Sequence, residues 1–182
     1  MNYRLANRND LPAMLEIYRL YVENDTASFE YETPSLAAFA ARFGAITTAF
    51  SWYVAEEDGV VAGYAYASRA FERAAYQWDA DLSVYIAAPF HGRGVGRALY
   101  ALLERDLVRM GYVNAYALVT AENGGSIAFH ERVGYRLVAE LPASGYKFGR
   151  WMGVKWYMKV LCDAPDPGPA PIPFPELNRQ EE

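Results

Sequence analysis

Cysteine and histidine are scarce in this chain of 182 residues, which has one cysteine and two histidines. The single cysteine, Cys162, excludes a disulfide within the chain and fits a reducing cytoplasm. Histidine, cysteine and carboxylate residues nowhere show the close spacing of a zinc site, so we expect no metal. No apolar run is long enough to cross a bilayer, and the N-terminus lacks a signal-peptide core. These absences predict a cytoplasmic protein that binds no metal.

An excess of positive charge is also missing. Lysine and arginine number 17 against 22 aspartate and glutamate, which gives a formal net charge of −5. Nucleic acid and anionic membranes are therefore not expected as partners. The length suits one well-buried domain, and we place it over residues 1–162. Most of the prolines fall after it, so residues 163–182 are expected to be a proline-rich extension without regular helix or interior strand.

Apolar periodicity predicts the element order βααβββαβαββ, a mixed α/β sheet with helices on its faces. The clearest unit runs from Trp78 to Gly111 and reads as a strand, a glycine-rich turn and a helix. Towards the end of the chain, residues 142–150 contain two glycines and are expected to form a loop before the last strand.

The glycine-rich turn reads His91-Gly92-Arg93-Gly94-Val95-Gly96-Arg97. The first amides of the helix that follows have no internal partners and lie at the positive end of its dipole. This combination binds phosphate, and the two arginines add positive charge. An ordinary tight turn is the alternative. The spacing matches neither the dinucleotide fingerprint nor the P-loop.

The strand before this turn carries carboxylates on one face. Period-two alternation places Asp79, Asp81, Ser83 and Tyr85 together. A carboxylate inside a strand goes against β-propensity. It could act as a general base that takes a proton from an amine. The alternative is a carboxylate that pairs with an arginine or faces solvent.

A second helix carries a candidate acid. If the segment from Ser126 to Val133 is helical, Ser126 and His130 share a face, with Asn123 near the N-terminus. A histidine with a pKa near 6.5 could protonate a leaving thiolate or relay the amine proton. The simpler alternative is a half-buried histidine with one backbone hydrogen bond.

Two motifs in this order resemble those of the GNAT superfamily of N-acetyltransferases. His91-x-x-Gly94-x-Gly96, after Val84-Tyr85-Ile86, is similar to the diphosphate loop. The segment from Asn123 through Ser126, His130 and Glu131 to Gly134-Tyr135 is similar to the acyl-CoA-binding segment. Further matches resemble the phosphinothricin acetyltransferase branch: Phe29, Thr33-Pro34, Arg73, Tyr76, Trp78 and Gly145-x-Lys147-x-Gly149-x-Trp151. The chain departs from the family at His91, normally Gln or Arg, and at Asp81, normally Glu.

The resemblance implies the GNAT fold, with a mixed central sheet splayed at a bulge and helices on both faces. It implies acetyl transfer from acetyl-CoA to the α-amine of a small amino-acid-like acceptor such as phosphinothricin, methionine sulfoximine or methionine sulfone, and hence herbicide resistance. It also implies a homodimer. An acetyltransferase for polyamines or protein N-termini, and a non-catalytic acyl-CoA sensor, remain alternatives.

The resemblance assigns roles by position. Asp81 and His130 are the expected catalytic residues, and the shorter side chain of Asp81 leaves open whether it takes the amine proton directly or through a water relay. Backbone amides of the central strand would stabilise the oxyanion. The expected cofactor residues are Val84, Tyr85, Ile86, Gly92, Arg93, Gly94, Val95, Gly96, Arg97, Asn123 and Ser126. The expected acceptor residues are Phe29, Arg73, Tyr76 and Ser83, and Arg73 suits an acidic acceptor.

Overall fold

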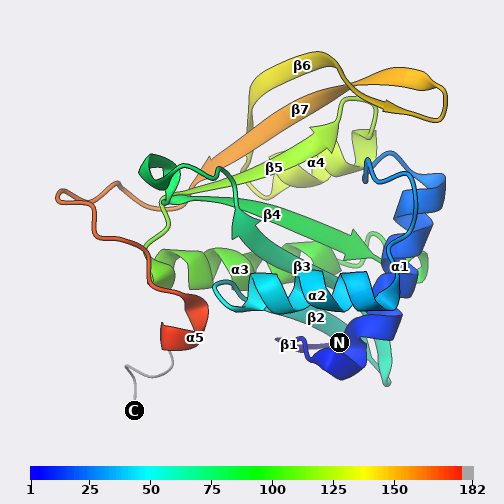
Figure 1. Ribbon diagram of the computed structural model, residues 1–182, viewed down its shortest axis with the longest axis horizontal. Coiled ribbons are helices and arrows are strands. Elements are labelled where there is room, and N and C mark those ends of the chain that lie inside the picture. The colour runs from blue at the N-terminus through cyan, green and yellow to red at the C-terminus, as the bar shows by residue number, and fades with distance from the viewer. Residues whose placement is uncertain (178–182) are drawn as a thin grey trace.

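A seven-stranded mixed sheet forms the centre of the protein (Figure 1). The structure is a computed structural model and describes residues 1–177. The strands follow the order β1-β2-β3-β4-β5-β7-β6, and only the β4–β5 pair is parallel. Their bounds are β1 Asn2–Leu5, β2 Trp52–Glu57, β3 Val60–Arg69, β4 Asp79–Ile86, β5 Asn114–Thr120, β6 Arg136–Lys147 and β7 Arg150–Val160.

Helices cover both faces of the sheet, as expected. Helix α3 packs on one face, and α1 and α2 pack on the other, over the β2–β4 half (Figure 1). The order of strands and long helices matches the predicted βααβββαβαββ. The α-helices are α1 Leu11–Asn24, α2 Leu36–Thr47, α3 Val95–Met110, α4 Gly124–Arg132 and α5 Phe174–Leu177, and the short 3₁₀ turns are η1 Arg8–Asp10, η2 Ala74–Tyr76 and η3 Ala88–Phe90.

The prediction of a loop over residues 142–150 is wrong. Strand β6 continues to Lys147 and β7 begins at Arg150, so only two residues turn the chain. Both turn residues, Phe148 and Gly149, have positive φ angles of 51° and 74°. The β6–β7 register shifts between Leu141 and Gly145. This irregularity lets the strand pass Pro142, which cannot donate to a regular ladder.

The proline-rich extension also differs from its prediction, because it contains the short helix α5. Phe174 and Leu177 are only 8% and 7% exposed and belong to the core beside α3. Ile172 and Phe174, which keep their amide hydrogens between prolines, donate to Met110 and Ala49 carbonyls. The last part of the predicted extension, residues 178–182, lies outside the described residues.

The central strands splay apart, as the resemblance implied. Strands β4 and β5 pair only at three positions, from Asp79–Asn114 to Asp81–Tyr116. Beyond them β4 runs on to Ile86 and β5 to Thr120 without pairing with each other. The β3–β4 register is unbroken over the same length. The opening therefore comes from divergence of β4 and β5 and involves no extra residue between β3 and β4.

Candidate active site

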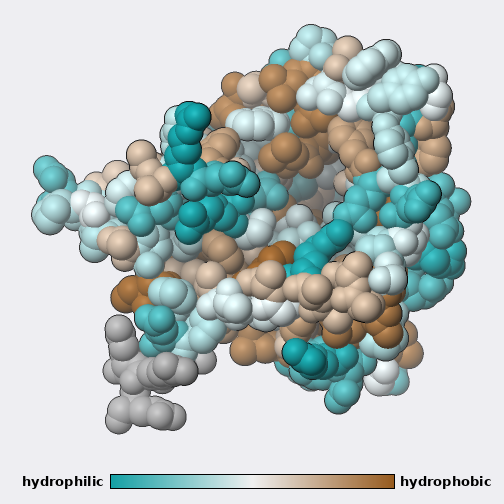
Figure 2. Space-filling model, in the orientation of Figure 1, coloured by the Kyte–Doolittle hydropathy of each residue, from teal (hydrophilic) through white to brown (hydrophobic). Residues whose placement is uncertain are grey.

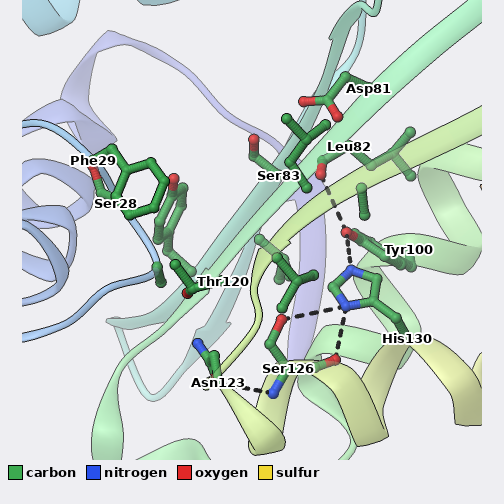
Figure 3. Close-up of a pocket in the computed structure, with 16 residues that line it drawn as sticks. Ser28, Phe29, Asp81, Leu82, Ser83, Tyr100, Thr120, Asn123, Ser126 and His130 are labelled. Atoms are coloured by element: carbon green, nitrogen blue, oxygen red, sulfur yellow. Dashed lines mark hydrogen bonds between the residues drawn. The ribbon is translucent and has the colours of Figure 1, made fainter. Parts of the chain in front are cut away.

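A cavity of about 250 Å³ occupies the gap between β4 and β5. Its walls come from these strands, from α3 and α4, and from the segment between α1 and α2 (Figure 3). The structure brings together many residues predicted from the sequence. Those that line the cavity are Phe29, Asp81, Ser83, Val84, Tyr85, Asn123, Ser126 and His130.

Backbone groups of alternate β4 residues face the gap. The N–H of Ala87 donates to Ala62 of β3, so the groups of the neighbouring Ile86 point the other way. The same alternation directs the N–H and C=O of Val84 and Leu82 towards the gap. Since β5 has already diverged there, a bound molecule can pair with Val84 as an added strand would.

Ile86 differs from Val84 because two side chains already engage its backbone. Its carbonyl accepts hydrogen bonds from the Tyr21 hydroxyl at 2.7 Å and from His91 Nε2 at 2.8 Å. Its N–H donates to the Tyr21 oxygen at 3.3 Å. A carbonyl only accepts, so His91 carries its hydrogen on Nε2. In this structure His91 therefore supports the strand, and Ile86 is already satisfied where the cofactor was expected to bind.

The glycine loop forms an open cradle in front of α3. Gly92 and Gly94 have φ angles of 71° and 79°, and a Cβ at either position would have no heavy atom within 4 Å. The first intrahelical bond runs from Ala98 N–H to the Gly94 carbonyl. The amides of the three preceding residues (Val95, Gly96 and Arg97) therefore have no intrahelical partner. Free amides, a helix N-terminus and empty space suit a diphosphate.

The two arginines of the loop are not equivalent. The guanidinium of Arg93 bonds both carboxylate oxygens of Glu57 at 2.8 Å and lies 5.0 Å from the Phe90 ring centroid. Arg97 is exposed and has no ion pair within residues 1–177. Of these two arginines, Arg97 is therefore the one whose charge is unpaired within the described part of the chain.

Asp81 stands at the point where the splay begins. Its Oδ1 atom is buried and has no hydrogen-bond partner in the described part of the chain. Burial raises the pKa of Asp81 to about 7, because the charged form loses water without gaining a partner. A carboxylate with this pKa can take and release a proton near neutral pH. Asp79, two residues earlier, accepts a hydrogen bond from Asn114 at 2.8 Å and is a structural residue.

A hydrogen-bonded chain crosses the gap opposite Asp81 (Figure 3). The Tyr100 hydroxyl lies 3.3 Å from the Leu82 carbonyl and 3.0 Å from His130 Nε2. His130 Nδ1 lies 2.8 Å from the Ser126 carbonyl and 3.3 Å from the Ser126 hydroxyl. The carbonyl can only accept, so Nδ1 carries the hydrogen and Nε2 accepts one from Tyr100. Burial lowers the pKa of His130 to about 4, which keeps it neutral at pH 7.

The two predicted residues at the start of α4 shape the helix as well as the cavity. The side chain of Asn123 accepts from the N–H of Ser126 at 3.0 Å and caps the helix. The Ser126 carbonyl and hydroxyl in turn contact His130. Both residues therefore orient the histidine, whatever contact they make with a ligand.

The predicted acceptor residues divide into two groups. Phe29, 38% exposed, and Ser83 line the cavity. Arg73 and Tyr76 do not; they lie at and within η2, where Arg73 is exposed and Tyr76 is 48% exposed. Of the four predicted acceptor residues, only Phe29 and Ser83 thus belong to the cavity wall, and Arg73 and Tyr76 lie outside it.

Known proteins resemble this chain along nearly its whole length. Residues 3–156 match the family model described as an acetyltransferase (GNAT) domain. The phosphinothricin N-acetyltransferase of Streptomyces viridochromogenes is 31% identical, covering 93% of this chain and 91% of its own. The L-methionine sulfoximine/L-methionine sulfone acetyltransferase of Salmonella typhimurium is 32% identical, with 91% and 99% covered. The chain belongs to the GNAT family of acetyltransferases.

A solved structure supports acetyl-CoA as the co-substrate of this acetyltransferase. The phosphinothricin acetyltransferase of Sinorhizobium meliloti, in complex with AcCoA, superposes with a TM-score of 0.84 at 34% identity and covers 87% of each chain. The open glycine cradle and the backbone of Val84 fit such a ligand. Within residues 1–177 there is no cluster of three metal-binding side chains, and no helix is long and apolar enough to cross a membrane.

The sequence did not reveal how the acetyltransferase fixes the segment between α1 and α2, whose Ser28 and Phe29 line the cavity. The buried ammonium of Lys147, on β6, donates to the carbonyls of Asp25 and Ser28 at 2.8 and 2.6 Å. Burial lowers its pKa. Gly145 leaves room for the Phe29 ring, which a Cβ there would strike. The β6–β7 hairpin thus fixes the segment that carries Ser28 and Phe29.

Tyr100 is a second residue that the sequence left unnoticed. It lies on the buried face of α3, where an apolar pattern predicts only core packing. Its hydroxyl is the group that connects His130 to the gap. The signal that could have found it is a tyrosine, with its polar end, among the leucines of a buried helix face.

Proposed function

We propose that this enzyme transfers the acetyl group of acetyl-CoA to the α-amine of a small amino-acid-like acceptor of the phosphinothricin, methionine sulfoximine or methionine sulfone type. The activities for which the relatives are named support this acceptor class. Acetyl-CoA supplies an activated thioester. The cradle from Gly92 to Arg97 would hold its diphosphate, and the backbone of Val84 would pair with its pantetheine arm, beside Tyr85 and Asn123.

The observation that carries the proposal is the buried carboxylate of Asp81. An amine acceptor is mostly an ammonium ion at neutral pH and must lose a proton before it attacks. Asp81 has an unpartnered oxygen in the cavity and a pKa of about 7. It can therefore accept that proton, directly or through water. The amides facing the gap from β4 can stabilise the negative charge that develops on the acetyl oxygen.

His130 is proposed to act as a proton relay and not as the acid that protonates the leaving thiolate. With hydrogen on Nδ1 and a pKa of about 4, it has no proton to give from Nε2. The reaction removes two protons from an ammonium acceptor, and one of them leaves with the CoA thiolate as the thiol. The Tyr100 oxygen can take the other proton while its own hydrogen passes to His130 Nε2. The Nδ1 hydrogen then passes to the Ser126 hydroxyl as that hydroxyl releases its own hydrogen to solvent. We assign it as a relay. The overall reaction of an ammonium acceptor releases one proton, which such a path can carry out of the gap.

Arg73 is proposed to meet an acceptor carboxylate or another anionic group. It is exposed and has no ion pair within the described residues, next to η2. A guanidinium binds carboxylates through two parallel hydrogen bonds. Tyr76 and Ser83 would complete this side of the acceptor site.

The finer features inferred from the resemblance belong to the proposal as well. A homodimer would cover edge strand β6, whose Leu137 and Val138 are 45% and 49% exposed. A cytoplasmic location agrees with the single free cysteine. Acetylation of phosphinothricin in the cell would confer herbicide resistance. We place the catalytic domain over residues 1–162 and the extension after it.

The test is a thiol-release assay with acetyl-CoA and a panel of acceptors. We expect turnover with phosphinothricin, methionine sulfoximine or methionine sulfone, and none with spermidine. Turnover with spermidine or a peptide N-terminus alone would overturn the acceptor class, while acetyl transfer from acetyl-CoA to an amine would stand. Acetyl-CoA binding without turnover of any acceptor would favour a non-catalytic sensor.

A further inference from the structure

Three aromatic side chains form a platform on the open face of the sheet beside Asp81. Phe71, which precedes η2, contacts Tyr116 of β5 and Trp156 of β7, with ring centroids 5.5 and 5.8 Å apart. Tyr116 and Trp156 contact each other at 6.5 Å. All three are partly exposed. This group, called the aromatic platform below, has no part in the steps described above.

The register of the sheet places the platform next to the reacting groups. Tyr116 is the direct partner of Asp81 in the β4–β5 pairing, so their side chains share one face. Trp156 is the partner of Leu118, which lines the cavity and is 54% exposed. The platform is therefore continuous with the cavity wall. Figure 2 shows this face hollowed near its middle, with apolar surface above the hollow and hydrophilic surface to its left and right.

The paired stretches of β5 and β7 beside the cavity present no charge on this face. From β5 the side chains are Asn114, Tyr116, Leu118 and Thr120, and their β7 partners are Val160, Met158, Trp156 and Val154. The lysines of β7 alternate with these residues and lie on the opposite face, where Lys155 and Lys159 pair with glutamates. An anionic side chain resting here would lose water and gain no cation from these stretches of β5 and β7. Arg136, the β6 partner of Met158, lies at the edge of this face, and Arg73 is assigned to the acceptor's carboxylate.

We propose that the aromatic platform is the subsite for the acceptor's side chain and that it selects neutral, apolar or aromatic side chains. This inference rests on the proposed transfer to an amino-acid amine and narrows its substrate class. With its α-amine at Asp81, the acceptor extends over Leu118 and Tyr116 onto Trp156 and Phe71. Methionine, methionine sulfone and phenylalanine fit this surface. Glutamate and phosphinothricin carry an anionic side chain and fit it poorly.

The experiment compares kcat/KM for methionine, phenylalanine, methionine sulfone, phosphinothricin, glutamate and alanine. We expect the neutral acceptors with long side chains to exceed glutamate and phosphinothricin at least tenfold. Trp156→Ala and Phe71→Ala should each lower kcat/KM for phenylalanine about tenfold and change that for alanine less than twofold. Trp156→Phe should restore most of the loss. The Kd for acetyl-CoA should not change.

Trp151→Ala is the matched control. Trp151 lies on the same strand, is 65% exposed and contacts Tyr146 rather than the platform. It should leave the acceptor order unchanged. If Trp156→Ala does not fold, the same comparison is made with Phe71→Ala and with Leu118→Asn, since Leu118 is exposed.

Several results would overturn the inference while the proposed function stands. One is a higher kcat/KM for glutamate or phosphinothricin than for the neutral acceptors. Another is an equal loss of kcat/KM for alanine and phenylalanine in Trp156→Ala. A third is a change of oligomeric state in the platform variants, which would make this face a contact between copies of the chain. Failure of every amino-acid acceptor in the parent enzyme would instead refute the proposed function itself.

Discussion

The two sides of the gap are built in different ways. The cofactor side comes from one continuous stretch, β4 through the glycine loop into α3, together with the start of α4. The acceptor side is assembled from segments far apart in the sequence, and one of its central bonds joins residues 119 positions apart, Lys147 and Ser28. A side made from one stretch can be specified by local sequence, whereas the other exists only after the sheet has formed.

Because the two sides are built separately, we expect substitutions on one side to change one binding constant and leave the other unchanged. Cofactor-side changes should alter the Kd of acetyl-CoA, and acceptor-side changes should alter the KM of the amine. Asp81 lies between them and should affect the chemical step alone.

The largest effect is expected for Asp81→Asn. Loss of the base should lower kcat about 10²- to 10⁴-fold, while the Kd of acetyl-CoA stays within about twofold. In the parent enzyme kcat/KM should rise with pH around an apparent pKa of about 7, as Asp81 ionises. Steady-state kinetics and calorimetry measure both quantities. Parent-like turnover in the variant would show that Asp81 is not the base.

Asp81 should also make the protein less stable as the pH rises. Its folded pKa, about 7, exceeds its ordinary value of 3.8, so the folded state holds the proton longer than the unfolded state. Stability is therefore lost between about pH 4 and pH 7, by about 4 kcal/mol in total. Relative to the parent, Asp81→Asn should gain this amount from pH 4 to pH 8 in denaturant unfolding. A constant difference between the two proteins would contradict the raised pKa.

Lys147→Met should loosen the acceptor side. Two carbonyls lose their buried partner, so the segment carrying Ser28 and Phe29 can move. We expect the KM of the amine to rise about tenfold and the Kd of acetyl-CoA to stay the same. Arg150→Met is the control on the same hairpin, since Arg150 is exposed and pairs with Glu122. A loss of cofactor affinity in Lys147→Met would mean that the two sides are coupled.

The smallest effect is expected for Gly94→Ala on the cofactor side. Its φ of 79° costs an alanine about 1 kcal/mol of stability, and the new methyl group enters the open cradle. The Kd of acetyl-CoA should rise about fivefold. Gly59→Ala is a close match, because Gly59 has the same φ and open space but lies in the β2–β3 turn. It should lose similar stability and bind acetyl-CoA normally.

Turn chemistry and periodicity were the most predictable parts of the fold. Asp58 and Gly59 adopt the positive φ angles of a tight hairpin turn, and Gly111 ends α3 at a φ of 94°. Residues 142–150 misled prediction because their glycines and proline signal a turn. The β6–β7 pairing absorbs them in a register shift instead. The extension misled it because Phe174 and Leu177, which find their place only on the folded core, outweigh the surrounding prolines.

The sequence by itself determined the element order, the glycine cradle at the start of α3 and the positions of Asp81 and His130. These depend on backbone geometry and on side-chain spacing along single elements, which local sequence encodes. Tertiary structure decided that Arg93 pairs with Glu57, that His91 and Tyr21 occupy the backbone of Ile86, and that Tyr100 connects His130 to the gap. It also decided which way the His130 proton points and how far burial shifts the pKa of Asp81. These properties depend on partners distant in sequence and on the loss of water, and both appear only when the chain is packed.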